Sequence, residues 1–171
     1  GLPDDGTAVM GILNITPDSF HDGGEYNTVA KAVERAEQMI EEGVDILDIG
    51  GESTRPGAQP LSVDEELNRV IPVIESLREL DVLLSVDTRK SEVAQAALDA
   101  GADILNDVSG LEDPEMRHVA VKNDSPVIVM HSIETPVDPD ADIDYDDVVE
   151  DTIEQLRERV LVAEKAGLTR D

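Results

Sequence analysis

Two short segments of the sequence follow the same plan. GVDILDIG (residues 43–50) and GADILNDVSG (residues 101–110) each begin with glycine, continue with an aspartate and a short apolar run, and end in polar residues. Glycine commonly ends a helix, and a short apolar run rich in isoleucine is typical of a strand covered on both faces. The repetition therefore predicts strand–helix units with right-handed crossovers and a parallel sheet.

The same alternation continues along the whole chain and predicts an α/β fold with five strands. Aromatic residues make up only 2% of the sequence, so the core must consist of Val, Ile, Leu and Ala. In the helix expected near the end of the chain, Val149, Ile153, Leu156 and Val160 recur at helical spacing and should face inward. The expected strands are residues 8–13, 46–49, 82–86, 102–105 and 127–130, and the expected helices are residues 27–43, 62–77, 91–100, 114–123 and 146–166.

The charge excludes several classes of partner. Forty Asp and Glu residues oppose 13 Lys and Arg, which gives a net charge of −27. Nucleic acids and anionic membranes need a basic surface, so neither is an expected partner. The acidic residues are spread along the chain, which favours a protein from a salt-rich cytoplasm, where molar salt reduces the Debye length to about 3 Å. No apolar run is long enough to span a bilayer and no signal peptide is evident, so we expect a soluble cytoplasmic protein.

Metal sites built from the commonest motifs are not indicated. The sequence has no cysteine, which excludes disulfides and thiolate zinc sites. Aspartates alternate from residue 138 to 144 as in an EF-hand loop, but Ile143 stands where glycine is needed and Val149 where glutamate is needed. We interpret this run as a solvated acidic loop that leads into a helix.

Every expected strand ends in a residue that can take part in chemistry. These residues are Asn14, Asp48, Asp87, Asn106 with Asp107, and His131. The ends of parallel strands meet at one edge of the sheet, so we expect most of these side chains to form one site. The alternative for Asp48 or Asp107 is a structural aspartate that binds loop amides.

The second strand opens into an unusual polar loop, DIGGESTRPG (residues 48–57). We expect Gly50 and Gly51 to give the backbone conformational freedom there. Arg55 supplies a planar fork of donors suited to carboxylate or phosphate, and Ser53 and Thr54 add hydroxyls beside it. The alternative is a solvated loop in which Arg55 pairs with the glutamate at residue 52.

Five motifs in order resemble those of dihydropteroate synthase. They are MGILNITPDSF (residues 10–20), DIGGESTRPG (residues 48–57), SVDT (residues 85–88), LNDVSG (residues 105–110) and VIVMHS (residues 127–132). The resemblance implies a (β/α)₈ TIM barrel that joins 4-aminobenzoate to 6-hydroxymethyl-7,8-dihydropterin diphosphate in folate biosynthesis. Only five of the eight units are matched, so residues 1–171 are expected to form one pterin-binding domain, an incomplete barrel of about five parallel strands.

The resemblance also implies roles for individual residues. Asn14 would meet a diphosphate bound to Mg²⁺, and Asp22 would belong to a lid around a cationic intermediate. Thr54 and Arg55 would act on the diphosphate and aminobenzoate side. The pterin pocket would be lined by Asp87, Asn106 and Met130, whereas His131 is expected to be structural.

Two further hypotheses compete with the synthase. One is a pterin-binding methyltransferase domain, which shares the barrel but has no diphosphate or aminobenzoate for the STRPG segment to hold. The other is an inactive half-barrel that works only as part of a larger assembly, and for it we expect the 171-residue piece alone to be inactive and either oligomeric or poorly folded. The resemblance also allows for a homodimer and for fusion to another folate-pathway domain.

Overall fold

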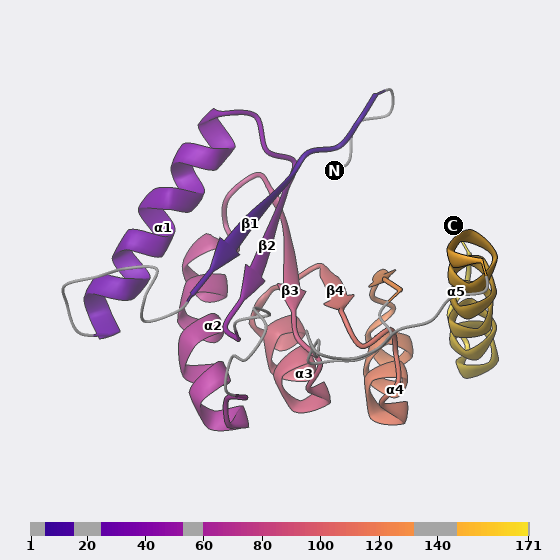
Figure 1. The fold of residues 1–171 in the computed structure, drawn as a ribbon. Coiled ribbons are helices and arrows are strands. Elements are labelled where there is room, and N and C mark those ends of the chain that lie inside the picture. Colours follow the sequence, from indigo (N-terminus) through magenta and orange to yellow (C-terminus); the bar gives the residue numbers. More distant parts are fainter. Residues whose placement is uncertain (1–5, 16–24, 53–59, 132–146, 171) are drawn as a thin grey trace.

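A computed structural model describes residues 6–15, 25–52, 60–131 and 147–170. Five strands alternate with five helices in it, as the repeated plan of the sequence predicts (Figure 1). The strands are β1 (Met10–Asn14), β2 (Ile46–Gly50), β3 (Leu83–Asp87), β4 (Ile104–Asp107) and β5 (Val127–Val129). The helices are α1 (Glu25–Glu41), α2 (Val63–Leu77), α3 (Ser91–Ala100), α4 (Pro114–Asn123) and α5 (Val148–Ala166).

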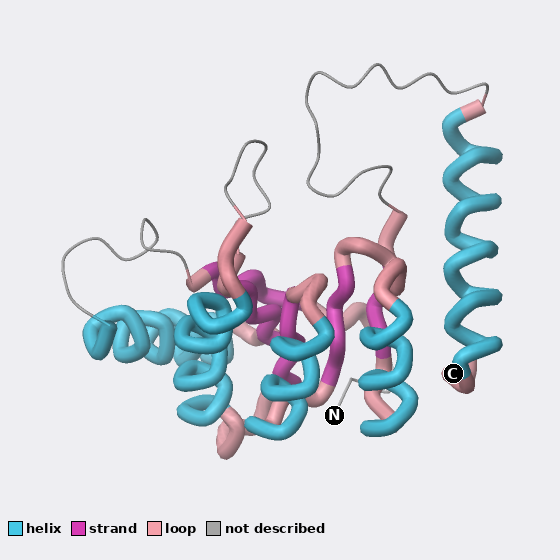
Figure 2. The backbone as a smooth tube through the Cα atoms, turned by 90° about the horizontal axis from the view of Figure 1, so that it is seen from below, coloured by secondary structure: helices cyan, strands magenta, loops and turns pink. Residues whose placement is uncertain are grey.

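All strand pairs are parallel, and the strands lie in the order β1-β2-β3-β4-β5. In a doubly wound sheet the strand order reverses, which places helices on both faces. Here each crossover leads to the next strand in the same direction, so the helices follow one another along one face of the sheet (Figure 2). This sequential order is that of a (β/α)₈ barrel, and the sheet is an incomplete barrel with β1 and β5 at its edges.

The core lies between the sheet and the helices. Strand residues that face the helices are almost completely buried, including Leu47, Ile49, Leu84 and Val86. On the opposite face, Ile12 of β1 is 63% exposed. We call this side, which none of the described helices covers, the open face, and in a complete barrel it is the interior.

A local signal in the sequence produces the expected start of a helix. The helix α2 begins with a capping box, in which the Ser62 side chain accepts from the Glu65 amide and the Glu65 side chain accepts from the Ser62 amide. Pro72 lies inside that helix.

Among the described residues, no helix combines the length and the apolar composition that crossing a lipid bilayer requires.

The predicted inward stripe of the last helix is wrong for its first half. In α5, Val149 is 61% exposed and Ile153 is 42% exposed, and the buried residue of the helix is Ala163. A barrel helix normally packs between two neighbouring helices, but α5 packs against α4 and β5 and has no described helix on its other side (Figure 1). The N-terminal half of α5 therefore presents its apolar residues to solvent.

Candidate functional site

One row of paired residues crosses the sheet at the C-terminal ends of the strands. Asn14 pairs with Gly50, Gly50 with Asp87, Asp87 with Asn106, and Asn106 with Ile128. Successive side chains of a strand point to opposite faces, so members of one row share a face. The fully buried neighbours Ile49 and Val86 face the helices, which leaves this strand-end row on the open face.

Gly50 leaves space between two polar side chains of this row. A Cβ atom on Gly50 would lie 3.3 Å from Asn14 Oδ1 and 3.5 Å from Asp87 Oδ2. Neither Gly50 nor Gly51 is among the described glycines with positive φ, so the expected role in backbone freedom is wrong. Gly51 is needed for space as well, because its Cβ would lie 3.0 Å from a methyl of Val70.

Asp48 lies one layer below the strand-end row and orients a member of it. Its carboxylate is buried and accepts from Ser85 Oγ at 2.7 Å and from Asn106 Nδ2 at 2.9 Å. These bonds hold the amide group of Asn106 in one orientation. Asp48 is thus a positioning residue on the open face, not a member of the outermost row as its place in the sequence suggested.

Asp87 has an unusual titration. Burial raises the pKa of this carboxyl, and the negative charges of Asp48 and Glu66 raise it further, to about 7. A buried carboxylate surrounded by other carboxylates favours the protonated form because desolvation and repulsion both act against the charge. Near neutral pH, Asp87 therefore changes readily between a donor and a charged acceptor.

Asp107 has the structural role that was the alternative for it. It directly follows Asn106 in β4, so its side chain points to the helix face, where it is fully buried. The carboxylate accepts from the Ser109 amide at 2.9 Å, the Ser109 hydroxyl at 2.7 Å and the Leu111 amide at 2.8 Å. Asp107 therefore shapes the β4–α4 loop and is not part of the site.

The structure also contains a cluster of ion pairs that the sequence patterns did not indicate. Glu52 and Glu66 lie beside Arg89 and Lys90, close to the C-terminal end of β3. Glu66 belongs to an acidic first turn with Asp64 and Glu65, and nothing in the sequence distinguishes it as the buried one. A basic pair directly after the strand-end motif SVDT is the only sequence signal that points to the cluster.

The structure describes four of the predicted site residues. Asn14, Asp87 and Asn106 lie in the strand-end row, and Met130 follows β5 directly and is 43% exposed. Asp22, Thr54 and Arg55 lie outside the described residues, as does most of the acidic run from residue 138. Within the described ranges, no group of three or more His, Asp or Glu residues could hold a metal ion.

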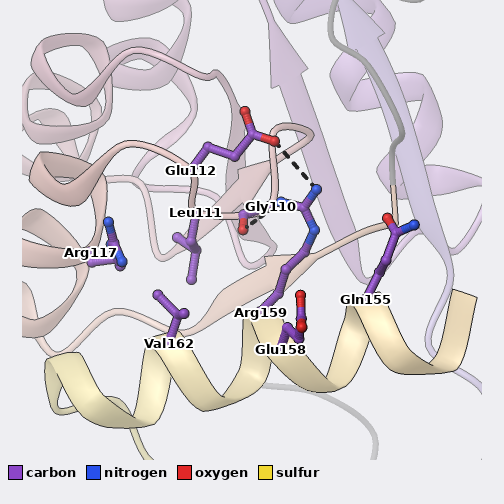
Figure 3. A pocket seen from close by; sticks show the side chains of 8 residues that line it. All are labelled: Gly110, Leu111, Glu112, Arg117, Gln155, Glu158, Arg159 and Val162. Carbon is purple, nitrogen blue, oxygen red and sulfur yellow. Dashed lines mark hydrogen bonds and ion pairs between the residues drawn. The ribbon is translucent and has the colours of Figure 1, made fainter. Parts of the chain in front are cut away.

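A cavity of about 370 Å³ lies away from the strand-end row. Figure 3 shows Arg159 reaching from α5 to Gly110 and Glu112 of the β4–α4 loop at this cavity. No member of the row lines it, and it separates α5 from the loop and α4. The lining residues are Gly110, Leu111, Glu112, Arg117, Gln155, Glu158, Arg159 and Val162.

Comparison with known proteins identifies the family. The model of the pterin binding enzymes matches residues 10–171. The chain belongs to the pterin binding enzyme family. It is 68% identical over 97% of its length to a probable bifunctional folylpolyglutamate synthase/dihydropteroate synthase from Haloferax volcanii, and 69% identical over its full length to one of the same description from Halobacterium salinarum.

A solved pterin binding enzyme shares the fold. Dihydropteroate synthase from Xanthomonas albilineans, solved with 4-aminobenzoic acid, is 49% identical and superimposes with a TM-score of 0.86 over 95% of this chain. The chain spans 57% of that protein, and 20% and 21% of the two bifunctional relatives. The family and the fold are therefore those that the five motifs predicted.

Proposed function

We propose that this chain forms the pterin-binding part of a dihydropteroate synthase. The reaction would join 4-aminobenzoate to 6-hydroxymethyl-7,8-dihydropterin diphosphate and release diphosphate and 7,8-dihydropteroate. The observation that carries the proposal is the pairing of Asp87 with Asn106 on the open face, with the Asn106 amide oriented by Asp48. The names of the similar proteins support the same reaction.

The pterin would bind at Asp87, Asn106 and Met130. The edge of a pterin ring carries several N–H donors, which a carboxylate and an amide oxygen can accept, and its ring face suits an apolar side chain such as Met130. Donors on the ring stabilise the charged form of the carboxyl, so binding would lower the pKa of Asp87 from its raised value.

The diphosphate and aminobenzoate would bind on the side of Asn14, Thr54 and Arg55. The bond from the pterin methylene carbon to the diphosphate oxygen would break, the amine nitrogen would form the new bond to that carbon, and the amine would lose a proton. Arg55 would neutralise charge on the departing diphosphate, and Asp22 would stabilise positive charge at the methylene.

A magnesium ion fits the Asn14 side of this arrangement. Mg²⁺ keeps several waters and binds through one or two protein oxygens together with substrate phosphates, so an exposed amide oxygen beside Gly50 is a suitable ligand. The ion would supply charge neutralisation on the diphosphate when bound.

The proposal extends to the protein as a whole. The two bifunctional relatives support fusion to a folylpolyglutamate synthase domain. A homodimer, a cytoplasmic location and the structural role of His131 stay predictions, and so does the inactivity of the 171-residue piece alone.

The test is product formation by the full-length gene product that carries this chain. We expect it to form dihydropteroate and diphosphate from the two substrates. Methyl transfer from a folate to a corrinoid, without dihydropteroate synthesis, would instead establish the methyltransferase alternative.

Arg55 provides the sharpest variant for this proposal. A charge-assisted hydrogen bond is worth about 1.5 to 3 kcal/mol, so Arg55→Ala should lower kcat/KM by at least about tenfold. Arg55→Lys keeps the charge but loses the paired geometry, and it should cause a smaller loss. Binding of pterin alone, measured by calorimetry, should change little. Near-normal turnover in Arg55→Ala together with an inactive Asp87→Ala would show that the loop is structural.

A further inference from the structure

The Glu52 carboxylate joins three separate parts of the chain. Its Oε1 accepts from Arg89 Nε at 2.9 Å, and its Oε2 accepts from the Leu61 amide at 2.8 Å and from Lys90 Nζ at 2.8 Å. The Glu52 side chain is only 17% exposed, so water does not easily replace these donors. Glu52 is thus bound by three donors among the described residues, and Arg55, its partner in the solvated-loop alternative, lies outside them.

Two of these residues flank the connection between β2 and α2. Glu52 precedes residues 53–60 and Leu61 follows them, so the bond between Glu52 and the Leu61 amide holds the two ends of this segment together. Arg69 of α2 adds a bond from its Nη1 to the Gly51 carbonyl oxygen at 3.0 Å. The base of the connection is therefore fixed on both sides.

The same carboxylate fixes this base to the end of β3. Lys90 also forms an ion pair with Glu66 of α2, which is 1% exposed and accepts from Thr88 Oγ1 at 2.6 Å. Burial would raise the pKa of Glu52, but the bonds from Lys90 and Leu61 outweigh it and hold the pKa below its usual value. Glu52 therefore stays charged, and its position relative to Asp87 is set through Lys90.

We propose that Glu52 is a positioning residue that holds both ends of the β2–α2 connection at a fixed place relative to the pterin side of the site. This inference rests on the proposed function, which assigns that connection to the diphosphate and aminobenzoate side. Glu52 should therefore control the binding of 4-aminobenzoate and of the diphosphate, whereas the pterin ring depends on Asp87 and Asn106. Displacing a binding group by even about 1 Å can cost two orders of magnitude.

The test compares two substitutions that each remove one partner of Lys90. In the full-length protein, Glu52→Gln should raise the KM for 4-aminobenzoate by roughly 10- to 100-fold and leave the Kd for pterin alone, measured by calorimetry, within about twofold. Glu66→Gln is the matched control, because Glu66 has no bond to Leu61. At pH 8.5, where Asp87 is ionised in every variant, it should lower the urea midpoint without changing the ratio of the KM for 4-aminobenzoate to the Kd for pterin. Glu52→Asp keeps the charge but is one methylene too short to reach Leu61, so it should reproduce the KM effect in a more stable protein.

Amide exchange of the peptide that contains Leu61 gives a second measurement without substrates. Exchange should become faster in Glu52→Gln and Glu52→Asp, and it should stay unchanged in Glu66→Gln. Equal changes in the KM for 4-aminobenzoate and in the Kd for pterin, or the same ratio of these two constants in Glu52→Gln and Glu66→Gln, would overturn the positioning role. If the full-length protein forms no dihydropteroate, the proposed function fails by itself. Unchanged exchange of the Leu61 amide in the Glu52 variants would then independently reject the role of Glu52 in holding the two ends of the β2–α2 connection.

Discussion

At the scale of single residues, Asp87 should make the stability of the protein depend on pH. Its pKa is raised from 3.8 to about 7 by burial and by neighbouring carboxylates. Between these values the folded state keeps a proton that the unfolded state has lost, so the contribution of this group is full below about pH 4 and is lost as the pH rises through 7. Asp87→Asn cannot ionise, and it should stabilise the protein more at pH 8 than at pH 4.5.

Urea midpoints of wild type and variant at the two pH values, at constant salt, measure this difference. Asp81→Asn makes the same chemical change at an exposed position and serves as the control. An equal effect of Asp87→Asn at both pH values would show that the carboxyl titrates normally.

The sequence predicted which residues end strands but not the depth or face at which each lies. Asn14, Asp87 and Asn106 share one row because parallel strands align their ends. Asp48 and Asp107 were indistinguishable from them until the register was known, since a shift of one residue moves a side chain to the opposite face. The roles of Glu52 and Glu66 could not be predicted either, because their partners Thr88, Arg89 and Lys90 come from a different loop.

At the scale of elements, Arg159 fastens α5 to the β4–α4 loop. The side chain is 14% exposed, and its Nη1 donates to the Ser109 carbonyl oxygen at 2.5 Å and to the Gly110 carbonyl oxygen at 3.0 Å. Gly110 has a φ of +68° and Leu111 one of +64°, so the loop holds a conformation that side-chain-bearing residues rarely adopt. Arg159→Met should therefore lower the free energy of unfolding by about 1.5 to 3 kcal/mol.

Urea denaturation of the full-length protein measures this loss. Arg157→Met makes the same change two residues away on an exposed part of α5 and should have little effect. Equal midpoints for the two variants would mean that Arg159 does not hold the loop.

Helix boundaries could be predicted where local signals and burial agree. The ranges for α3 and α4 match the structure to the residue, because glycine or an acidic cap ends or begins each apolar pattern. The inward stripe of α5 was wrong because periodicity shows which side of a helix is apolar and not whether a neighbour covers it. Val149 and Ile153 carry the pattern of a buried face without the contacts.

At the scale of the whole molecule, the repeated strand–helix plan was sufficient to predict a parallel α/β sheet, but strand order was not contained in it. The order β1 to β5 without reversal is what distinguishes a barrel segment from a doubly wound sheet. Only the five motifs, through their resemblance to a barrel family, led to the correct expectation.

The net charge of −27 should make folding of the whole molecule depend on salt. Compaction brings like charges together, and molar salt screens them because the Debye length falls to about 3 Å. We expect the urea midpoint of the full-length protein to rise between dilute and molar potassium chloride; urea is uncharged and does not itself screen. A variant that combines Glu37→Gln, Glu75→Gln and Glu154→Gln removes three exposed negative charges and should depend less on salt. A urea midpoint that does not change with potassium chloride would show that repulsion among these charges does not limit the stability of the fold. The acidic composition would then not be an adaptation to salt.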